Sequence, residues 1–407
     1  MKIAGILEGL KVISMEHMEA IPAASVWFAD WGADVIKIEP PAGDMFRMTK
    51  RAHGTPAFVE IGGRDINWAF WLLNRNKKSM ALNLKTDSGR DIIYKLIKDA
   101  DIFLSNFQFD ALDNLKLDYD SLCKVNPRII HAVLSGYGSI GPDKDEPGFD
   151  NTAAWSRSAL MYLTGEEGKP PPIQRGGMMD RTAAPHVVAG VLAALYNREK
   201  TGKGQKLEVS LFHSAVWTNG KDIQGAIVDR PMPRSDRTKA DSPIWNSYRT
   251  KDDRWFQLGM LQSDRYWPNF YRAINRPDFE KDPKYVDMEA RRTNCVELIR
   301  IIDEIMATRT MAEWEKIFKE TGCMYGRVQT PQEVITDPQA LANDFYADIE
   351  FPEGKMKTIN TPVKFYQNPA SVRTAPPELA QDNEVILLEM GYTWEDIARL
   401  KDEGAIL

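Results

Sequence analysis

The sequence predicts an α/β protein with a large domain built on a doubly wound, Rossmann-like parallel sheet and a smaller α+β domain. Strand-like and helix-like segments alternate through the first half of the chain, which is typical of a parallel sheet covered by helices on both faces. The length of 407 residues exceeds that of an ordinary single domain. The polar, proline-containing segment Asp229–Ser242 is predicted to be a linker, and the sequence after it is richer in aromatic residues.

The elements of the large domain follow from hydrophobic pattern and turn signals. Pro22 opens a helical pattern that ends near Gly32, and apolar strands flank it, so this βαβ unit implies a parallel sheet with a right-handed crossover. The expected strands are Leu10–Met15, Asp34–Glu39, Ser79–Leu84, Asp101–Ser105, Ile129–Val133 and Lys206–Ser210. The expected helices span residues 22–31, 88–99, 119–125 and 183–196. Ligands of such a sheet bind at the carboxyl ends of its strands.

The smaller domain is predicted from short strand patterns among clustered aromatic residues, followed by helices. The strands are Ser247–Arg249 and Trp255–Leu258, and the helices span residues 296–307 and 311–321. Near the end of the chain, residues 384–400 are expected to form one amphipathic helix.

Composition excludes several classes of protein. The formal charge of −6 argues against a nucleic-acid binder, and no run of about 18 apolar residues predicts a membrane span. The three cysteines and five histidines lack metal-ligand spacing, so we expect no metal site. The loop after the first strand lacks GxGxxG, which counts against an NAD enzyme. We expect a cytoplasmic protein.

The stretch Gln174–Arg181 places a carboxylate, Asp180, after two glycines and before an apolar, alanine-rich segment. Glycine gives the backbone unusual conformations and lets a ligand come close. An aspartate at a helix start faces the positive end of the helix dipole and accepts hydrogen bonds from free backbone N–H groups. Asp180 is therefore either a helix N-cap or a reactive carboxylate, and the local sequence alone favours the cap.

A series of short motifs runs in order through nearly the whole chain. They are LEGLKV (7–12), WGADVIKIEP (31–40), Gly43-Asp44 with Arg47, NRNKK (74–78), Asn106-Phe107, SGYG (135–138), GP (141–142), PGFD (147–150), Asp180 and REKTGKGQ (198–205). In this order they resemble the motifs of the class III CoA-transferases of the CaiB/BaiF type. That family includes formyl-CoA, 2-hydroxyacyl-CoA and benzylsuccinate-CoA transferases, and also the α-methylacyl-CoA racemases.

The resemblance implies that Asp180 is the nucleophile of a CoA-transferase. Its carboxylate would take CoA from a donor acyl-CoA as an aspartyl-CoA thioester and pass it to an acceptor carboxylic acid, without ATP. The partners would be these two substrates, with coenzyme A thioesters as substrates and no tightly bound cofactor. The resemblance also implies an interlocked dimer, either a homodimer or a heterodimer with a paralogous subunit. Its large domain would combine residues 1–225 with 335–407, and residues 226–334 would form the linkers and the small domain.

The resemblance also carries over individual site residues. The positions that match CoA-binding segments are His17, Met18, Ala20, Arg47, Leu73, Asn74, Arg75, Asn76, Asn106, Phe107, Gly136 and Tyr137. Tyr137 also matches a position near the thioester. Glu19, Arg175 and Arg181 are expected near the nucleophile, where the two arginines either hold a second carboxylate of a dicarboxylic acceptor or lie in solvent.

Several positions depart from the family's pattern. Residues 111–114 lack an expected basic residue, and residues 260–264 lack the glycine run of the formyl- and oxalyl-using branch. Phe149 stands where the racemases have a proton-transferring histidine, so racemisation is disfavoured. Glu19 and Arg181 are unusual beside the nucleophile, which leaves open a partner subunit without activity of its own. The acceptor is expected to be a 2-hydroxy, aromatic or aryl-dicarboxylic acid, and Trp68, Phe70, Trp71 and Trp155 suit either a bulky acid or core packing.

Overall fold

The computed structural model describes residues 5–407, which form two compact units. The larger unit takes the chain up to Met161, then Ile173–Met232 and Leu341–Leu407. The smaller unit consists of Tyr162–Pro172 and Pro233–Ala340. The boundaries expected at residues 225 and 335 therefore lie a few residues from those of the structure. The grouping of residues 162–172 with the smaller unit was not anticipated.

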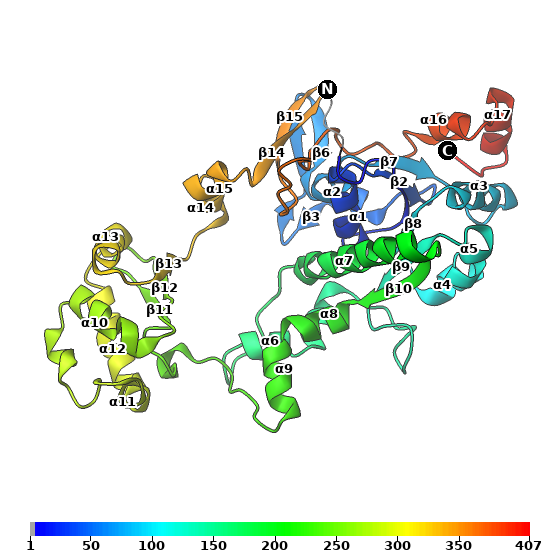
Figure 1. Ribbon diagram of the computed structural model, residues 1–407. Coiled ribbons are helices and arrows are strands. Elements are labelled where there is room, and N and C mark those ends of the chain that lie inside the picture. Colours follow the sequence, from blue (N-terminus) through cyan, green and yellow to red (C-terminus); the bar gives the residue numbers. More distant parts are fainter. Residues whose placement is uncertain (1–4) are drawn as a thin grey trace. The chain divides into compact units, whose positions relative to one another are not determined.

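The larger unit is built on one six-stranded parallel sheet, which confirms the predicted fold class (Figure 1). Its strands are β1 Lys11–Met15, β2 Asp34–Glu39, β7 Lys78–Ala81, β8 Ile102–Ser105, β9 Ile130–Ser135 and β10 Gln205–Ser210. Their order across the sheet is β10-β9-β8-β1-β2-β7, with Val12 of β1 in register with Val35 of β2 and Ile102 of β8. The order reverses between β1 and β8, where a doubly wound sheet binds its ligands.

Two apolar cores, one on each face, hold the helices against the sheet. One face carries α1 Ala20–Asp30, α2 Trp68–Asn74, α7 Met178–Thr201 and α8 Leu211–Thr218, with the π-helical turn η2 Asp150–Ser156. Helices α1 and α7 lie side by side there (Figure 1). The other face carries α3 Asp87–Lys98, α4 Phe109–Asn114, α5 Tyr119–Val125, α16 Asn383–Glu389 and α17 Trp394–Asp402.

The end of the chain returns to the large unit. Ile397 and Leu400 of α17 are buried in the same core as Ile92 of α3. Asn383 accepts a hydrogen bond from Ala81 N at 2.9 Å, so α16 is tied to the edge strand β7. The single helix expected over residues 384–400 is wrong: Gly391 has φ +87°, a conformation that favours glycine, and it separates α16 from α17.

Short hairpins and helices complete the larger unit. They are η1 Met45–Met48, the pairs β3 Arg51–Ala52 with β4 Thr55–Pro56, β5 Phe58–Ile61 with β6 Arg64–Asn67 and β14 Tyr346–Phe351 with β15 Gly354–Ile359, and α9 Gly220–Ile227. Helices α6 Leu160–Thr164 and α15 Pro338–Ala342 lie at its boundaries with the smaller unit.

The smaller unit is α+β, as predicted, with an antiparallel three-stranded sheet and its own core. The sheet has β11 Ser247–Arg249, β12 Trp255–Leu258 and β13 Tyr325–Arg327. Around it lie η3 Arg237–Lys239, α10 Ser263–Ala273, η4 Pro277–Glu280, α11 Met288–Thr293, α12 Cys295–Met306, α13 Met311–Thr321 and α14 Pro331–Val334. Its core includes Trp267, Trp314 and Phe318. Within residues 5–407, no helix is long and apolar enough to cross a membrane.

Candidate active site

A cavity of about 350 Å³ lies at the carboxyl ends of β1, β8 and β9, where the strand order reverses. It brings together eight of the residues expected at the site from the sequence. They are His17, Met18, Glu19, Ala20, Asn106, Phe107, Gly136 and Asp180. These residues come from the loops after three strands and from the start of α7, so the parallel topology itself assembles them.

Asp180 enters the cavity from the first turn of α7. The helix begins after Gly177, which has a left-handed conformation with φ +72°, so Gly177 is the N-cap, and the alternative in which Asp180 caps the helix is wrong. The capping carboxylate is Asp150, which accepts hydrogen bonds from Met179 N at 2.6 Å and Asp180 N at 3.1 Å. Because Asp150 accepts hydrogen bonds from these N–H groups, the Asp180 carboxylate is not needed to cap the helix and can interact with a ligand.

The environment of Asp180 raises its pKa to about 7, well above its ordinary value. Burial makes the largest contribution, because a desolvated carboxylate favours its neutral form. The negative charges of Asp150 and Glu19 add to the effect, and Arg181 opposes it. Burial likewise raises the pKa of both Asp150 and Glu19. A strongly perturbed carboxylate in a cavity is typical of a functional site.

Glu19 and Arg181, the two unusual residues, form an ion pair beside Asp180. Nη1 of Arg181 donates to Oε2 of Glu19. A Cβ atom on Gly177 would lie 1.8 Å from that Glu19 oxygen and 2.7 Å from Arg181 Nη1. Glycine at position 177 suits the left-handed backbone, and a side chain there would displace the ends of the Glu19 and Arg181 side chains.

The loop that carries His17, Met18 and Glu19 is fixed from both sides. Asn106 bonds both backbone groups of His17: its amide nitrogen donates to His17 O at 2.8 Å, and its oxygen accepts from His17 N at 3.1 Å. On the other side Oδ1 of Asp44 accepts from Met18 N at 3.0 Å. Met18 has φ +58°, so these contacts hold a residue with a side chain in the left-handed region.

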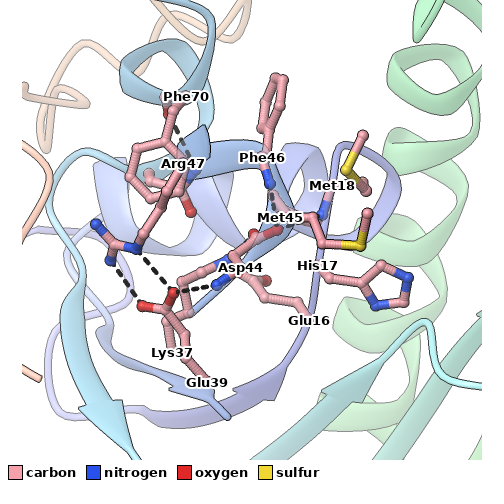
Figure 2. A network of polar contacts seen from close by, with 12 residues as sticks. Glu16, His17, Met18, Lys37, Glu39, Asp44, Met45, Phe46, Arg47 and Phe70 are labelled. Carbon is pink, nitrogen blue, oxygen red and sulfur yellow. Dashed lines mark hydrogen bonds and ion pairs between the residues drawn. The ribbon is translucent and has the colours of Figure 1, made fainter. Parts of the chain in front are cut away.

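A fully buried charge network lies behind this loop (Figure 2). Nζ of Lys37 lies 2.7 Å from Asp44 Oδ2 and 3.5 Å from Glu16 Oε1, and Nζ of Lys77 lies 2.7 Å from the same Glu16 oxygen. Burial alone would raise the pKa of Glu16, but Lys77 and Lys37 lower it to about 2. Glu16 is therefore ionised, and the network keeps its charges compensated without solvent.

Two buried polar atoms in the cavity lining have no hydrogen-bond partner among the described residues. They are Nδ1 of His17 and Oδ2 of Asp150. Burial lowers the pKa of His17, which favours the neutral imidazole. Native proteins leave few buried polar atoms unpaired, so these two mark places where a ligand or water would bond.

The other expected CoA contacts do not line the cavity. Arg47 makes two hydrogen bonds to Glu39, at 2.8 and 2.7 Å, and its guanidinium lies 4.4 Å from the centre of the Phe70 ring (Figure 2). Leu73, Asn74 and Arg75 are buried, with Arg75 paired to Asp30 at 2.7 Å.

Three further expected site residues also lie outside the cavity lining. Asn76 bonds Asp30 and backbone groups of residues 371–374, so it anchors the returning chain. Tyr137 packs partly buried against the core, and Arg175 is exposed. The proposed contacts of these residues with substrate stay predictions.

The sequence analysis missed several lining residues, above all Asp150. It also missed Lys144 and Phe109, and it considered Phe149 only as the counterpart of the racemase histidine, whereas the aromatic residues Phe70, Trp71 and Trp155 lie in the core. A signal was present in the PGFD motif: Gly148 lies against Gly136, where a Cβ would approach backbone to 2.6 Å, and so brings Asp150 next to the SGYG loop. Within residues 5–407 there is no cluster of three or more His, Cys, Asp or Glu side chains that could hold a metal ion.

The fold and this site define a class of enzyme that the comparison with known families identifies. The model of CoA-transferase family III matches residues 7–383. The chain belongs to that family and is a CoA-transferase, an enzyme of the EC 2.8.3 type.

Named relatives span the whole chain. The (R)-2-hydroxy-4-methylpentanoate CoA-transferase of Clostridioides difficile is 34% identical over 402 residues, covering 98% of this chain and 99% of that protein. The cinnamoyl-CoA:phenyllactate CoA-transferase of Clostridium sporogenes is 36% identical over 403 residues, covering 98% and 97%. The crystal structure of a CaiB/BaiF family protein from Brucella suis matches with a TM-score of 0.84 at 25% identity, covering 95% of this chain and 100% of that chain.

Proposed function

We propose that this enzyme moves CoA from an acyl-CoA to a 2-hydroxy or aromatic carboxylic acid through a thioester on Asp180. The observation that carries the proposal is Asp180 itself, a carboxylate with a pKa near 7 in a cavity at the reversal point of the sheet. The acceptor class rests on the relatives, whose names specify 2-hydroxy-4-methylpentanoate and phenyllactate. Phe107, Phe109 and Phe149 in the cavity lining suit an apolar acid.

The reaction would proceed in two symmetrical halves. The Asp180 carboxylate attacks the donor thioester carbonyl, giving a mixed anhydride and CoA thiolate. The thiolate attacks the aspartyl carbonyl, which releases the donor acid and leaves aspartyl-CoA. The acceptor carboxylate then attacks aspartyl-CoA, and the thiolate takes the acceptor's acyl group from the second mixed anhydride. Asp180 is restored as a carboxylate, and the thioester bond energy is conserved throughout.

The surroundings of Asp180 suit these steps. A partly desolvated carboxylate is a stronger nucleophile than one in water. The hydrogen bonds that fix the loop His17–Glu19 would hold this side of the cavity in one position for the substrate. The N–H groups of Met179 and Asp180 are bonded to Asp150, so the oxyanions need other donors. For CoA, we propose contacts with the cavity residues His17, Met18, Ala20, Asn106, Phe107 and Gly136.

The test is a panel of acyl-CoA donors against carboxylic acids, with new CoA esters identified by mass spectrometry. We expect esters of 2-hydroxy or aromatic acids from the purified chain and none from Asp180→Asn. Release of free CoA without a new ester, or activity that appears after adding a paralogous subunit, would contradict the proposal. Light scattering on the same sample tests the expected dimer.

A further inference from the structure

The Glu19–Arg181 ion pair carries an inference about the acceptor acid, which deepens the proposed function and rests on it. Arg181 follows the nucleophile directly in α7, and its charge acts on the Asp180 carboxylate. Its guanidinium is the group that a second carboxylate on an acceptor would bind. In the structure its Nη1 is already bonded to Glu19, and its Nη2 lies 3.4 Å from Gly176 O.

The ion pair is built into the site. Glu19 belongs to the loop that Asn106 and Asp44 fix through His17 and Met18. Its carboxylate lies over Gly177, where any side chain would collide with it. Glu19 lines the cavity and its side chain is 20% exposed, whereas the Arg181 side chain is 41% exposed and lies beside the cavity lining.

The charges around the nucleophile then discriminate between acids. The nearby carboxylates are those of Asp180, Asp150 and Glu19. Arg181 is already paired with Glu19. A second carboxylate would meet Glu19 and Asp150, an arrangement that rejects the wrong substrate by like-charge repulsion. Among the described residues that line the cavity, Lys144 is the one lysine or arginine, and it is 52% exposed and lies 3.7 Å from Asp145.

We propose that Glu19 is a specificity-determining residue: by occupying Arg181 it restricts the acceptor to acids with a single carboxylate. Of the acceptor classes expected from the sequence, the dicarboxylic one is excluded by this pair. Arg181 would serve a dicarboxylic acid if Glu19 carried no charge.

The experiment compares kcat/KM for 2-hydroxypentanoate and 2-hydroxyglutarate with one acyl-CoA donor. These acids share their chain length and reacting end and differ in the terminal carboxylate. The wild type should prefer the monocarboxylic acid. Glu19→Gln, which keeps the shape over Gly177, should move the ratio toward 2-hydroxyglutarate by about tenfold or more, the size of one gained charge-assisted hydrogen bond. The double variant Glu19→Gln/Arg181→Gln should lose that gain.

The readout is a ratio within one sample, so a loss of folded enzyme cancels. If Glu19→Gln turns over neither acid, calorimetric binding of the two acids gives the same ratio. An unchanged ratio in Glu19→Gln, or a shift produced by the control Lys144→Gln, overturns the inference and leaves the proposed function intact. If the wild type makes no CoA ester from either these acids or the panel above, the proposed function itself fails.

Discussion

At the scale of single residues, the proposed mechanism depends on the protonation of Asp180. Its pKa near 7 means that the Asp180 carboxylate is only partly ionised at neutral pH, and burial is the main cause of this value. Asp150 and Glu19 raise the pKa, and Arg181 lowers it. Burial therefore has two opposing effects: it lowers the fraction of Asp180 that is ionised, and it makes the ionised carboxylate more reactive.

The first prediction concerns the pH profile of kcat/KM for the acyl-CoA. We expect a rising limb with an apparent pKa near 7, because the deprotonated form of Asp180 attacks. Asp150→Asn keeps an oxygen for the N–H groups of Met179 and Asp180 but removes a negative charge, so it should move the limb to lower pH. A limb that stays in place in Asp150→Asn would contradict this electrostatic account.

The same carboxylate should destabilise the fold at neutral pH. Its pKa rises from 3.8 to about 7 on folding, so the folded state binds the proton more tightly. The resulting stability is present below about pH 4 and is lost as pH rises to about 7. Asp180→Asn should therefore raise the free energy of unfolding at about pH 8 by on the order of 4 kcal/mol, and by less at about pH 5. Urea unfolding at the two pH values measures this, and an equal effect at both would contradict it.

At the scale of elements, the start of α7 depends on Gly177. Gly177→Ala should destabilise the protein by more than the ~1–2 kcal/mol of left-handed strain and should lower activity, because its Cβ would displace Glu19 and Arg181. Gly202→Ala is a matched control at the other end of the helix: it has nearly the same φ, +71°, and its nearest neighbour is 4.0 Å away. Denaturant midpoints and kcat compare the two. Equal losses in both variants would show that the ion pair does not need Gly177.

The strand β2 supplies Lys37, one of the two buried cations of the network behind the loop. Lys37→Met would leave Asp44 without its lysine in a dry interior and Glu16 with Lys77 alone, so we expect a loss of about 3–5 kcal/mol in the free energy of unfolding. Lys78→Met removes a half-exposed pair with Asp34 and should cost at most about 1 kcal/mol. Urea unfolding compares them. Equal costs would mean that the Lys37 network adds nothing to stability.

At the scale of the whole molecule, the sequence predicted those strands and helices that have a clear local hydrophobic pattern. The strand Asp34–Glu39 was placed from its apolar run, and the alternation of strands and helices predicted that the sheet is parallel. The exposed hairpin of Phe58–Ile61 with Arg64–Asn67 has little hydrophobic alternation and was missed.

The errors at the site have a common physical origin in long-range contacts. Asp150 caps α7 by bonding Asp180 N, 30 residues further along the chain. The buried Arg75 pairs with Asp30, from which it is separated by 45 residues. No window of the sequence contains both partners of either contact. The resemblance named eight residues that line one cavity in the structure, but it could not show that Glu19 and Arg181 pair.

The central claim is that Asp180 becomes covalently linked to CoA, and trapping that link tests it most directly. The enzyme is incubated with an acyl-CoA, treated with hydroxylamine or borohydride, digested and analysed by mass spectrometry. We predict a modification on Asp180 that requires acyl-CoA and is absent from Asp180→Asn. A modification on Glu19 or Asp150 instead, or full transferase activity in Asp180→Asn, would contradict the account.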